Sequence, residues 1–398
     1  MTGVEPAGVA FEHRRLLAES VADFAARGTD LARVRRLRGA AAEYDRAVWK
    51  KMAELGWAGI LVPERYGGLG LGLTEMAIVA RGLAPALVPE PLTATAVLAA
   101  TALAASENEA LKREHLPQLA AGDLLPVLAW QERPGTLDPA AVETRAVPFE
   151  GGFKVNGVKR FIAGAAQADA FLVSARTAGD VVLLWLPRAA AGVRHGSEPL
   201  ADGRAFGILR LEDALVPRAA VAASGAAALE ALGQAFDFGC AIVGAELAGV
   251  ADRALEMSLD YLRTRVQFGK PIGSFQALQH RAVDLHIHRE LASAVLDEAL
   301  AVLDRGPAAA ARAAAASRVK ARCADAAARI TREAIQFHGA IGFTDEFDAG
   351  LYLKRALVLA AWLGSASWHR RRYARLTAGA KSEVESRKAE VGKPGGAA

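Results

Sequence analysis

Cysteine is nearly absent from this sequence: the 398 residues include only two, Cys240 and Cys323. Two cysteines cannot form a disulfide framework, and their spacing does not match that of metal ligands, so we expect no metal site and a reducing, cytoplasmic setting. No apolar stretch reaches about 18 uncharged residues, which argues against a membrane span. The first residues, Met1 to Phe11, lack a basic region followed by an apolar run, so no signal peptide is expected.

Strong charge of one sign is also missing. The net charge of +4 is small for this length, and the arginines are scattered among acidic residues. Short basic runs at 33–38 and 369–372 are typical of solvated helix faces rather than of nucleic-acid patches; their one functional use would be a weak attraction to the phosphates of a ligand. No Gly-x-Gly-x-x-Gly follows a strand pattern, and the glycines between Gly67 and Gly72 are interpreted as a structural connector. The sequence is instead rich in apolar residues, 52%, enough to bury a large core.

Hydrophobic periodicity divides the chain into regions of different texture. Residues 1–122 alternate helical periodicity with short breaks at glycine and proline. Residues 123–225 carry short apolar runs bounded by turn residues, which predicts a compact β domain. Within it, Asn156-Gly157 indicates a tight hairpin turn, because both residues tolerate positive φ. The apolar runs are 170–173, 181–186 and 205–209.

Long helices return in residues 226–380. The pattern predicts helices over Ala226–Arg265, Phe275–Asp304 and Ala308–His338, and the arginines and lysine within the alanine-rich last one favour a helix over low-complexity disorder. Residues 381–398 are charged and contain Gly-Lys-Pro-Gly-Gly near their end, so they are predicted to form a flexible tail. The order helical, β, helical indicates an α+β multidomain protein.

The most informative segment is Tyr261–Gln276, directly after the first of these long helices. Arg265 can pair with a diphosphate through two parallel donors, Phe268 offers a flat face to an adenine, and Gln276 can donate to and accept from a base or ribose. That combination suits a nucleotide. The alternative is a helix C-terminus closed by Gly269, with a solvated arginine.

This segment resembles the Arg-x-x-Phe-Gly signature of the acyl-CoA dehydrogenase family, and two further blocks are similar to that family in the same order. One block, Leu55–Gly70, is similar to the family's opening helical domain; the other is Gln336–Thr344, followed by Leu351–Ala356. Together the blocks span most of the chain. The resemblance implies an N-terminal α-helical domain, a middle β-barrel and a C-terminal four-helix bundle, in the order of the three regions above.

The resemblance also implies a flavin oxidoreductase. In the family, FAD takes a hydride from the β-carbon of an acyl-CoA thioester while a carboxylate removes the α-proton, so the site needs a flavin, a polarised thioester carbonyl and a partly desolvated base. The implied assembly is a tetramer, of identical chains or with a related acyl-CoA dehydrogenase subunit, with electron-transfer flavoprotein as acceptor. Neither nucleic acid nor a membrane is expected as a partner.

The sequence contains residues suited to bind the nucleotide half of the flavin. By the resemblance, Arg265, Gln267 and Phe268 would contact the diphosphate and adenine of a flavin bound mainly by the neighbouring subunit. Gly339 fits a backbone that approaches a ligand closely, although helix termination alone also explains it. The expected contacts outside the ring are Arg265, Gln267, Phe268, Gln276, Gln336, His338, Gly339 and Ala340.

The ring half of the flavin site is weakened or replaced. Family members usually carry Thr-Glu-Pro-x-x-Gly-Ser-Asp and then Trp-Ile-Thr in the middle domain. Here the first stretch is Ala129–Thr136, without Gly-Ser-Asp, and the second is Phe161-Ile162-Ala163. Phe161 can still stack on the ring, whereas Ala163 cannot form the hydrogen bond that a threonine would provide.

The catalytic base is missing from both positions where the family commonly carries it. Those positions fall on Leu363 and Gly239, neither of which can abstract a proton. Glu246 lies seven residues beyond Gly239 on the same helical face, displaced by about 10 Å. It is the candidate for a relocated base, and a structural ion pair is the alternative role for its carboxylate.

These asymmetries favour one subunit of a heteromeric acyl-CoA dehydrogenase, like the two-subunit enzymes that act on bulky, steroid-derived or dicarboxylic acyl-CoAs. Such a subunit keeps the half-site offered to a neighbour's flavin and has lost its own base. The alternatives are a self-sufficient homotetramer with Glu246 as the base, and a catalytically silent binding or scaffolding protein on this fold. A flavin monooxygenase relative is disfavoured, because the histidine often found in such proteins falls on Gly350.

Overall fold

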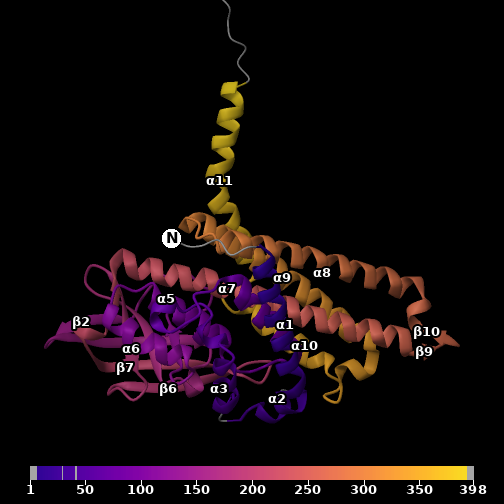
Figure 1. The fold of residues 1–398 in the computed structure, drawn as a ribbon, viewed down its shortest axis with the longest axis horizontal. Helices are drawn as coiled ribbons and strands as arrows, with labels where there is room; N and C mark the ends of the chain where they lie inside the picture. The colour runs from indigo at the N-terminus through magenta and orange to yellow at the C-terminus, as the bar shows by residue number, and fades with distance from the viewer. Residues whose placement is uncertain (1–6, 29, 41–42, 392–398) are drawn as a thin grey trace, which may run out of the picture.

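The computed structural model describes residues 7–28, 30–40 and 43–391. Along that part of the chain a helical region precedes a β region and another follows it, and the sheet lies at one end of the molecule (Figure 1). Asp30, Asp45 and Asn108 each accept a backbone N–H from the first turn of the helix that follows, as N-cap residues do. The N-terminal region contains α1 (Ala7–Gly28), α2 (Leu31–Leu37), α3 (Arg46–Glu54), α4 (Leu73–Leu83), the π-helical segment η4 (Leu92–Ala99), α5 (Ala100–Ala104) and α6 (Glu109–Ala120).

The middle region holds the strands β1 (Pro126–Ala129), β2 (Arg145–Phe149), β3 (Gly152–Ile162), β4 (Ala170–Arg176), β5 (Val181–Pro187), β6 (Val193–Pro199), β7 (Ala205–Pro217) and β8 (Val221–Ser224). They form one eight-stranded sheet in the described residues, in the order β6-β7-β3-β2-β4-β5-β8, with β1 parallel to β4. β4 and β5 are buried on both faces, which explains their unbroken apolar sequences.

Asn156-Gly157 does not form the predicted hairpin turn. Both residues lie inside β3, and the turn between β2 and β3 is made by Glu150 and Gly151, which have positive φ. The pairing of β3 with β7 shifts just before Gly157, so the Asn-Gly pair marks a β-bulge. An added Cβ at Gly157 would lie 2.4 Å from the Thr144 hydroxyl, and this close approach of the strands favours glycine.

The C-terminal region is a helical bundle in which α9 contacts α7, α8, α10 and α11. Its first three helices match the predicted ranges to within one residue at each end, because their patterns are long and end at glycine or proline signals. The elements are α7 (Gly225–Thr264), the hairpin of β9 (Val266–Gln267) and β10 (Lys270–Pro271), α8 (Gln276–Leu303), α9 (Ala309–His338), η8 (Gly339–Phe343), α10 (Ala349–Ala361) and α11 (Ala366–Val391).

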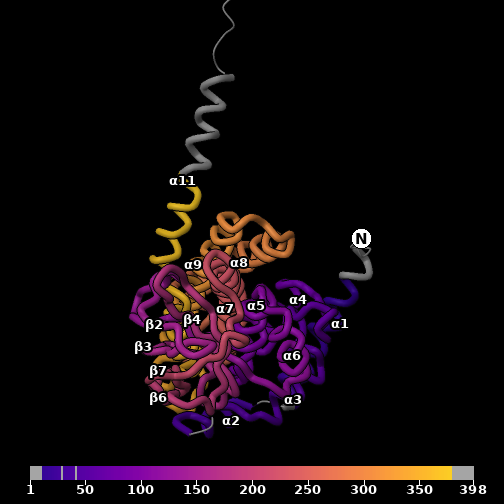
Figure 2. Tube along the Cα trace, turned by 90° about the vertical axis from the view of Figure 1, so that its left-hand side faces the viewer, coloured from indigo at the N-terminus to yellow at the C-terminus, as the bar shows by residue number. Residues whose placement is uncertain are grey.

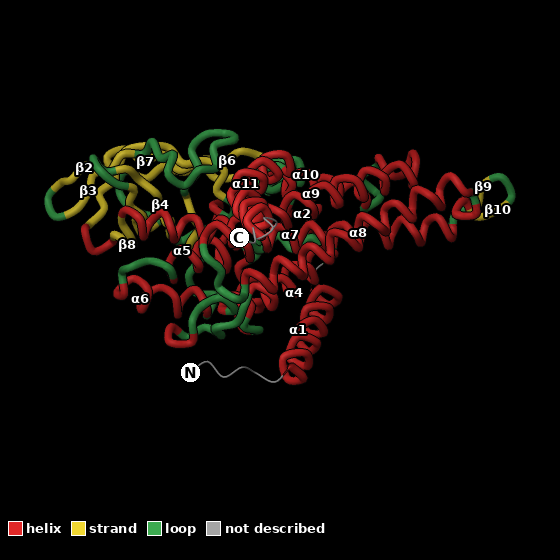
Figure 3. Tube along the Cα trace, turned by 90° about the horizontal axis from the view of Figure 1, so that it is seen from above, coloured by secondary structure: helices red, strands yellow, loops and turns green. Residues whose placement is uncertain are grey.

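Helix α7 joins the parts of the molecule. It contacts α4 on one side and β5 and β8 on the other, and Figure 2 shows it between the sheet and the N-terminal helices. The β9–β10 hairpin lies at the end of the bundle farthest from the sheet (Figure 3). The helix is long and apolar enough to cross a membrane, but 61% of its most apolar window is buried inside the protein, as in a core helix.

Helix α11 extends into the segment predicted to be a flexible tail. It continues to Val391 and projects from the body of the protein (Figure 1), while the remainder of that segment, 392–398, lies outside the described residues. The residues from 381 to 391 are rich in glutamate, lysine, arginine and alanine. These are strong helix formers, so local propensity explains why the helix continues into this segment.

Candidate functional site

A pocket of about 550 Å³, here called the ring pocket, lies where the end of β3 meets the loop between α10 and α11. Phe161, a predicted ring contact, lines it, and Phe206 of β7 lies 6.3 Å from Phe161 between ring centroids. Trp362 lies 6.2 Å from Phe206. These apolar faces suit a planar aromatic ligand such as a flavin ring. The pocket is lined by Gln131, Leu137, Phe161, Phe206, Trp362, Leu363, Gly364, Ser365, Trp368 and Arg371, among others.

Several residues that line the ring pocket could not be recognised from the sequence. Arg371 belongs to the basic run interpreted as a solvated helix face, yet it lies at the ring pocket together with Gln131 and Ser365. Trp362 could have been suspected from its place directly before Leu363, one of the two base positions. No local signal marks Phe206, because only the folding of β7 against the bundle brings it to the pocket. The ring pocket therefore has polar groups, but not those of the family pattern.

The two positions where the family carries its base meet in space. An added Cβ at Gly239 would lie 3.0 Å from Cδ1 of Leu363 and 2.4 Å from Cδ2 of Leu98. Leu363 is 2% exposed and Leu98 is 4% exposed. Leucine side chains thus fill the space that a carboxylate would need, and a carboxylate placed there would be buried in apolar surroundings at high cost. Neither position supplies a base in this chain.

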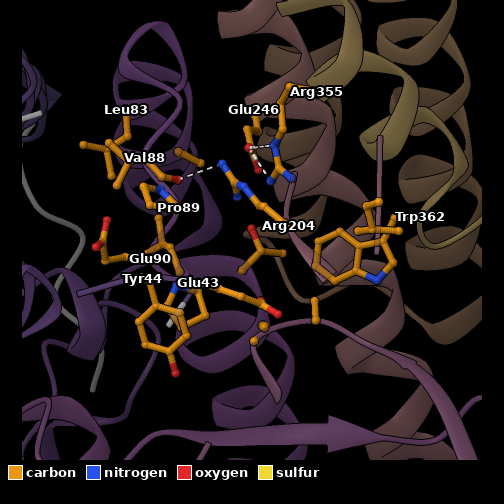
Figure 4. A pocket seen from close by; sticks show the side chains of 18 of the residues that line it. Glu43, Tyr44, Leu83, Val88, Pro89, Glu90, Arg204, Glu246, Arg355 and Trp362 are labelled. Carbon is orange, nitrogen blue, oxygen red and sulfur yellow. Dashed lines mark hydrogen bonds and ion pairs between the residues drawn. The ribbon is translucent and has the colours of Figure 1, made fainter. Parts of the chain in front are cut away.

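Glu246 belongs to an ion-pair network (Figure 4). Nη2 of Arg355 lies 2.7 Å from Oε1 of Glu246, and Nη1 of Arg355 lies 2.9 Å from Oδ2 of Asp202. The side chain of Arg355 is 9% exposed and that of Asp202 is 5% exposed. Burial alone would raise the pKa of Asp202, but the charges of Arg355 and Arg204 outweigh it and hold that pKa below its ordinary value. This geometry favours the structural alternative for Glu246 over the role of relocated base.

A second, smaller cavity of about 70 Å³ lies beside this network and is here called the charged cavity. Its lining includes Glu43, Arg204, Glu246 and Arg355. The volume fits a few water molecules, not an acyl chain. Ala163, expected at the flavin ring, lines the charged cavity and not the ring pocket, because the chain turns away from that pocket after Phe161.

Replacing Glu43 by glutamine is expected to change how stability depends on pH. Burial raises the pKa of Glu43 from 4.5 to about 7, an effect that Arg204 only partly offsets. The native state therefore binds this proton more tightly than the unfolded chain, and the group's contribution to the free energy of unfolding falls as pH rises from about 4.5 to about 7. Glu43→Gln should raise that free energy at pH 8 by about 1 kcal/mol, a small value because the carboxyl is only partly buried.

Urea denaturation of both proteins at about pH 4 and about pH 8 measures this effect. The two proteins should have nearly equal stability at the lower pH, where the carboxyl is protonated in both states. An equal stabilisation at both pH values would show that packing, not ionisation, explains the difference.

The predicted nucleotide contacts on the hairpin and the start of α8 form a group, here called the nucleotide clamp: Arg265, Gln267, Phe268 and Gln276. All four are exposed, Phe268 by 90%. Phe268 has φ +52 and meets Phe275 edge-on at 6.0 Å, so the hairpin presents an aromatic face to solvent. No described carboxylate pairs with Arg265. The clamp has the free donors and the flat face that a nucleotide requires.

The second group of predicted nucleotide contacts, between Gln336 and Ala340, is only partly exposed. Gln336 and Ala340 are exposed, and Gly339 ends α9 with φ +62, a conformation that by itself favours glycine there. His338 is not an exposed contact: it is 3% exposed, and Nδ1 donates to the Ala334 carbonyl at 2.7 Å. The residue falls on the inward face at the end of α9, where its ring packs 4.4 Å from both Tyr261 and Phe347.

The nucleotide clamp and the ring pocket of one chain are far apart. Gly239 lies against Leu363 of the ring pocket, and Arg265 follows 26 residues later, at the end of α7. At a rise of about 1.5 Å per residue the helix separates them by about 39 Å. An extended dinucleotide is shorter than this. One flavin therefore cannot contact both within a single chain.

Comparison with known proteins identifies the family of this chain. The acyl-CoA dehydrogenase N-terminal, middle and C-terminal domain models match residues 12–123, 128–213 and 229–377. The acyl-CoA dehydrogenase IpdE2 of Mycobacterium tuberculosis is 32% identical over 351 residues, which cover 87% of this chain and 91% of that protein.

Solved structures superpose closely. The Tcur3481-Tcur3483 steroid ACAD has a TM-score of 0.84 and 27% identity, with coverage of 93% of this chain and 99% of that one. The ChsE4-ChsE5 complex from Mycobacterium tuberculosis has a TM-score of 0.84 and 25% identity, with coverage of 95% and 99%. By these matches along nearly its whole length, the chain belongs to the acyl-CoA dehydrogenase family, whose members are flavoprotein oxidoreductases that act on acyl-CoA.

Proposed function

We propose that this chain is a subunit of a heteromeric, FAD-dependent acyl-CoA dehydrogenase, paired with a related subunit that carries the catalytic base. The observation that carries the proposal is the contact among Leu98, Gly239 and Leu363, which leaves no base at either family position. FAD, when bound, supplies the hydride acceptor for the β-carbon of an acyl-CoA thioester. Removal of the α-proton is assigned to the partner subunit.

The nucleotide clamp is the part of the flavin site that this chain contributes to its neighbour. Arg265 provides charge-assisted hydrogen bonds to a diphosphate, and Phe268 provides a stacking face for adenine. Gln267 and Gln276 supply amide donors and acceptors beside them. The distance from the clamp to the chain's own ring pocket supports a flavin shared across two subunits.

The ring pocket of this chain offers fewer contacts to a flavin than the nucleotide clamp does. The amide of Gln131 and the hydroxyl of Ser365 can form hydrogen bonds with the polar edge of an isoalloxazine, and Phe161 can stack on its face. Ala163 offers no such bond and lines a different cavity. We therefore expect the chain to retain flavin poorly when it has no partner subunit.

Exposed apolar side chains support an oligomer. Val283, Ile287 and Leu291 follow one another at four-residue intervals on α8 and are 56%, 49% and 51% exposed. They form one stripe along the helix, and an exposed stripe of this kind indicates a protein-protein contact. We assign a homologous subunit as the partner, by analogy with the ChsE4-ChsE5 complex. The substrate class we propose is a bulky, steroid-derived acyl-CoA, with electron-transfer flavoprotein as acceptor and the cytoplasm as location.

A second candidate is a self-sufficient homotetramer with Glu246 as its base. The position of Glu246 beside the charged cavity is the observation in its favour. The contact with Arg355 opposes it, because the guanidinium holds Oε1 of Glu246 in an ion pair through two nitrogens, Nε at 2.8 Å and Nη2 at 2.7 Å. A catalytically silent scaffold is the remaining alternative, and it predicts no bound flavin in any assembly.

Flavin content tests the proposal. The full-length chain is purified alone and after coexpression with a candidate partner of the same family, and bound flavin is measured from absorbance after denaturation. We expect well under one flavin per chain for the protein alone and a large gain in the coexpressed assembly. One flavin per chain in the homomer would contradict the heteromeric assignment, and no flavin in either preparation would support the scaffold.

Glu246→Gln should leave the rate of dye reduction by the coexpressed assembly nearly unchanged. Loss of a true base costs roughly 10²–10⁴-fold or more, so the two roles are well separated in one assay. Circular dichroism and flavin content must be checked alongside, because the substitution also removes one charge from the Arg355 network. A collapse of activity with fold and flavin intact would make Glu246 the base of a self-sufficient dehydrogenase.

A further inference from the structure

Two lysines are fully buried behind the ring pocket. Lys159 on β3 and Lys320 on α9 are both 0% exposed. An ammonium group is strongly hydrated, so its burial is costly unless its donors are satisfied. Each lysine meets that requirement by donating to the backbone of a segment that lines the ring pocket.

Lys320 holds the loop between α10 and α11. Its Nζ donates to the Gly364 carbonyl at 2.9 Å and to the Ala360 carbonyl at 3.2 Å. His369 Nε2 donates to the Leu363 carbonyl at 2.8 Å. Leu363 and Gly364 both have positive φ, +56 and +105. Glycine tolerates such values, but they are unfavourable for the leucine at position 363. The shape of the loop therefore depends on hydrogen-bond donors from the helices packed against it, and Lys320 is the charged residue among these donors.

Lys159 holds a second segment of the pocket lining. Its Nζ donates to the Trp130 carbonyl at 3.3 Å and to Oε1 of Glu132 at 2.6 Å. These two residues flank Gln131, which lines the ring pocket. A third bond, 2.9 Å to the Ser174 hydroxyl, ties the ammonium to β4. Both neighbours of Gln131 are thus anchored to the interior of the sheet.

We propose that Lys159 and Lys320 are positioning residues that set the width of the ring pocket and hence this chain's affinity for an isoalloxazine ring. The inference rests on the flavin function proposed above. Neither lysine lines the pocket itself; each acts through a backbone segment that does. Methionine has a similar length and fills similar space, but it has no donors with which to hold two carbonyls.

Two ligand fragments separate this role from general stability. Lumiflavin carries only the ring, and ADP carries only the nucleotide half. Binding of each to the full-length chain is measured for the wild type and for Lys320→Met. Loss of the hydrogen bonds to the loop should weaken lumiflavin binding about tenfold. The absorption bands of the bound ring should lose fine structure, and ADP binding should be unchanged.

Lys112→Met is the matched control. Lys112 is 7% exposed and pairs with Glu109 at 2.7 Å on α6, away from the ring pocket. Its replacement should lower stability without changing either fragment's affinity. The double variant Lys159→Met with Glu132→Gln, which leaves no unpaired carboxylate, repeats the test at the second segment if Lys320→Met fails to fold.

The outcomes are distinct. Selective loss of lumiflavin binding in either lysine variant supports the inference. Unchanged lumiflavin binding in both variants, or equal loss of both fragments, overturns it while the proposed function stands. If the wild type binds ADP but no lumiflavin, the chain's own ring pocket does not hold a flavin, and the inference fails together with that part of the proposed function.

Discussion

Replacing Arg355 by methionine should lower the free energy of unfolding by about 3–5 kcal/mol. Arg355 is the shared cation of two carboxylates, Asp202 at 2.9 Å and Glu246 at 2.7 Å, and the three side chains are at most 14% exposed. Its removal leaves the carboxylate of Glu246 without its cation and Asp202 with Arg204 alone, at 3.7 Å, whereas methionine preserves much of the packing. Urea denaturation followed by circular dichroism measures the loss.

A matched surface variant and a rescue variant test the cause. Arg370 pairs with Asp325 at 2.5 Å, but its side chain is 57% exposed, so Arg370→Met should cost only about 0–1 kcal/mol. Combining Arg355→Met with Glu246→Gln removes the unpaired carboxylate while Asp202 and Arg204 stay paired, and should recover most of the stability. A loss for Arg355→Met no larger than that of the control would mean that solvent screens the network.

Replacing Arg265 by alanine should reduce flavin binding by the assembled protein about tenfold or more. A charge-assisted contact to a phosphate is worth about 1.5–3 kcal/mol. Arg265 is exposed and no described carboxylate competes for it, so its donors are available to a ligand. Flavin content of the coexpressed assembly and flavin loss on dilution measure the effect. Stability should change little, because the side chain is exposed.

Arg263→Ala is the control for this variant. Arg263 lies in the last turn of α7, two residues away, but pairs with Asp260 at 3.1 Å and is 71% exposed. It shares the charge and the location of Arg265 without belonging to the clamp. Equal flavin loss in the two variants would indicate a general electrostatic attraction, and unchanged flavin in Arg265→Ala would leave Arg265 as a solvated helix end.

Local patterns were sufficient wherever a short stretch of chain decides the structure. The ranges of α7, α8 and α9 follow from long helical periodicity, and β4 and β5 follow from apolar runs bounded by turn residues. The Asn156-Gly157 turn is wrong for an instructive reason. The same pair that permits a tight turn also permits a bulge where two strands approach closely, and only the neighbouring strand determines which one forms.

The site residues likewise include some whose surroundings could be predicted from the sequence and others whose surroundings depend on packing. Arg265 ends α7 and Phe268 lies in the hairpin that follows, where few residues pack against the side chains, so their exposure could be predicted. His338 belongs to the adjacent block in the family pattern, yet it faces inward, because the side on which the last turn of α9 packs depends on Tyr261 and Phe347. Arg371 was hidden in a basic run, and only the packing of α11 brings it to the ring pocket.

By itself, the sequence determined the family, the order of helical, β and helical regions and the lack of a base at Gly239 and Leu363, and it supplied the residues of the proposed nucleotide clamp. Each of these is carried by residue identity within a short segment. Only the tertiary structure decided that these two positions meet against Leu98, and that Glu246 is bound by Arg355. It also separated the clamp from the ring pocket, because contacts between residues distant in sequence arise from packing, which no local pattern encodes.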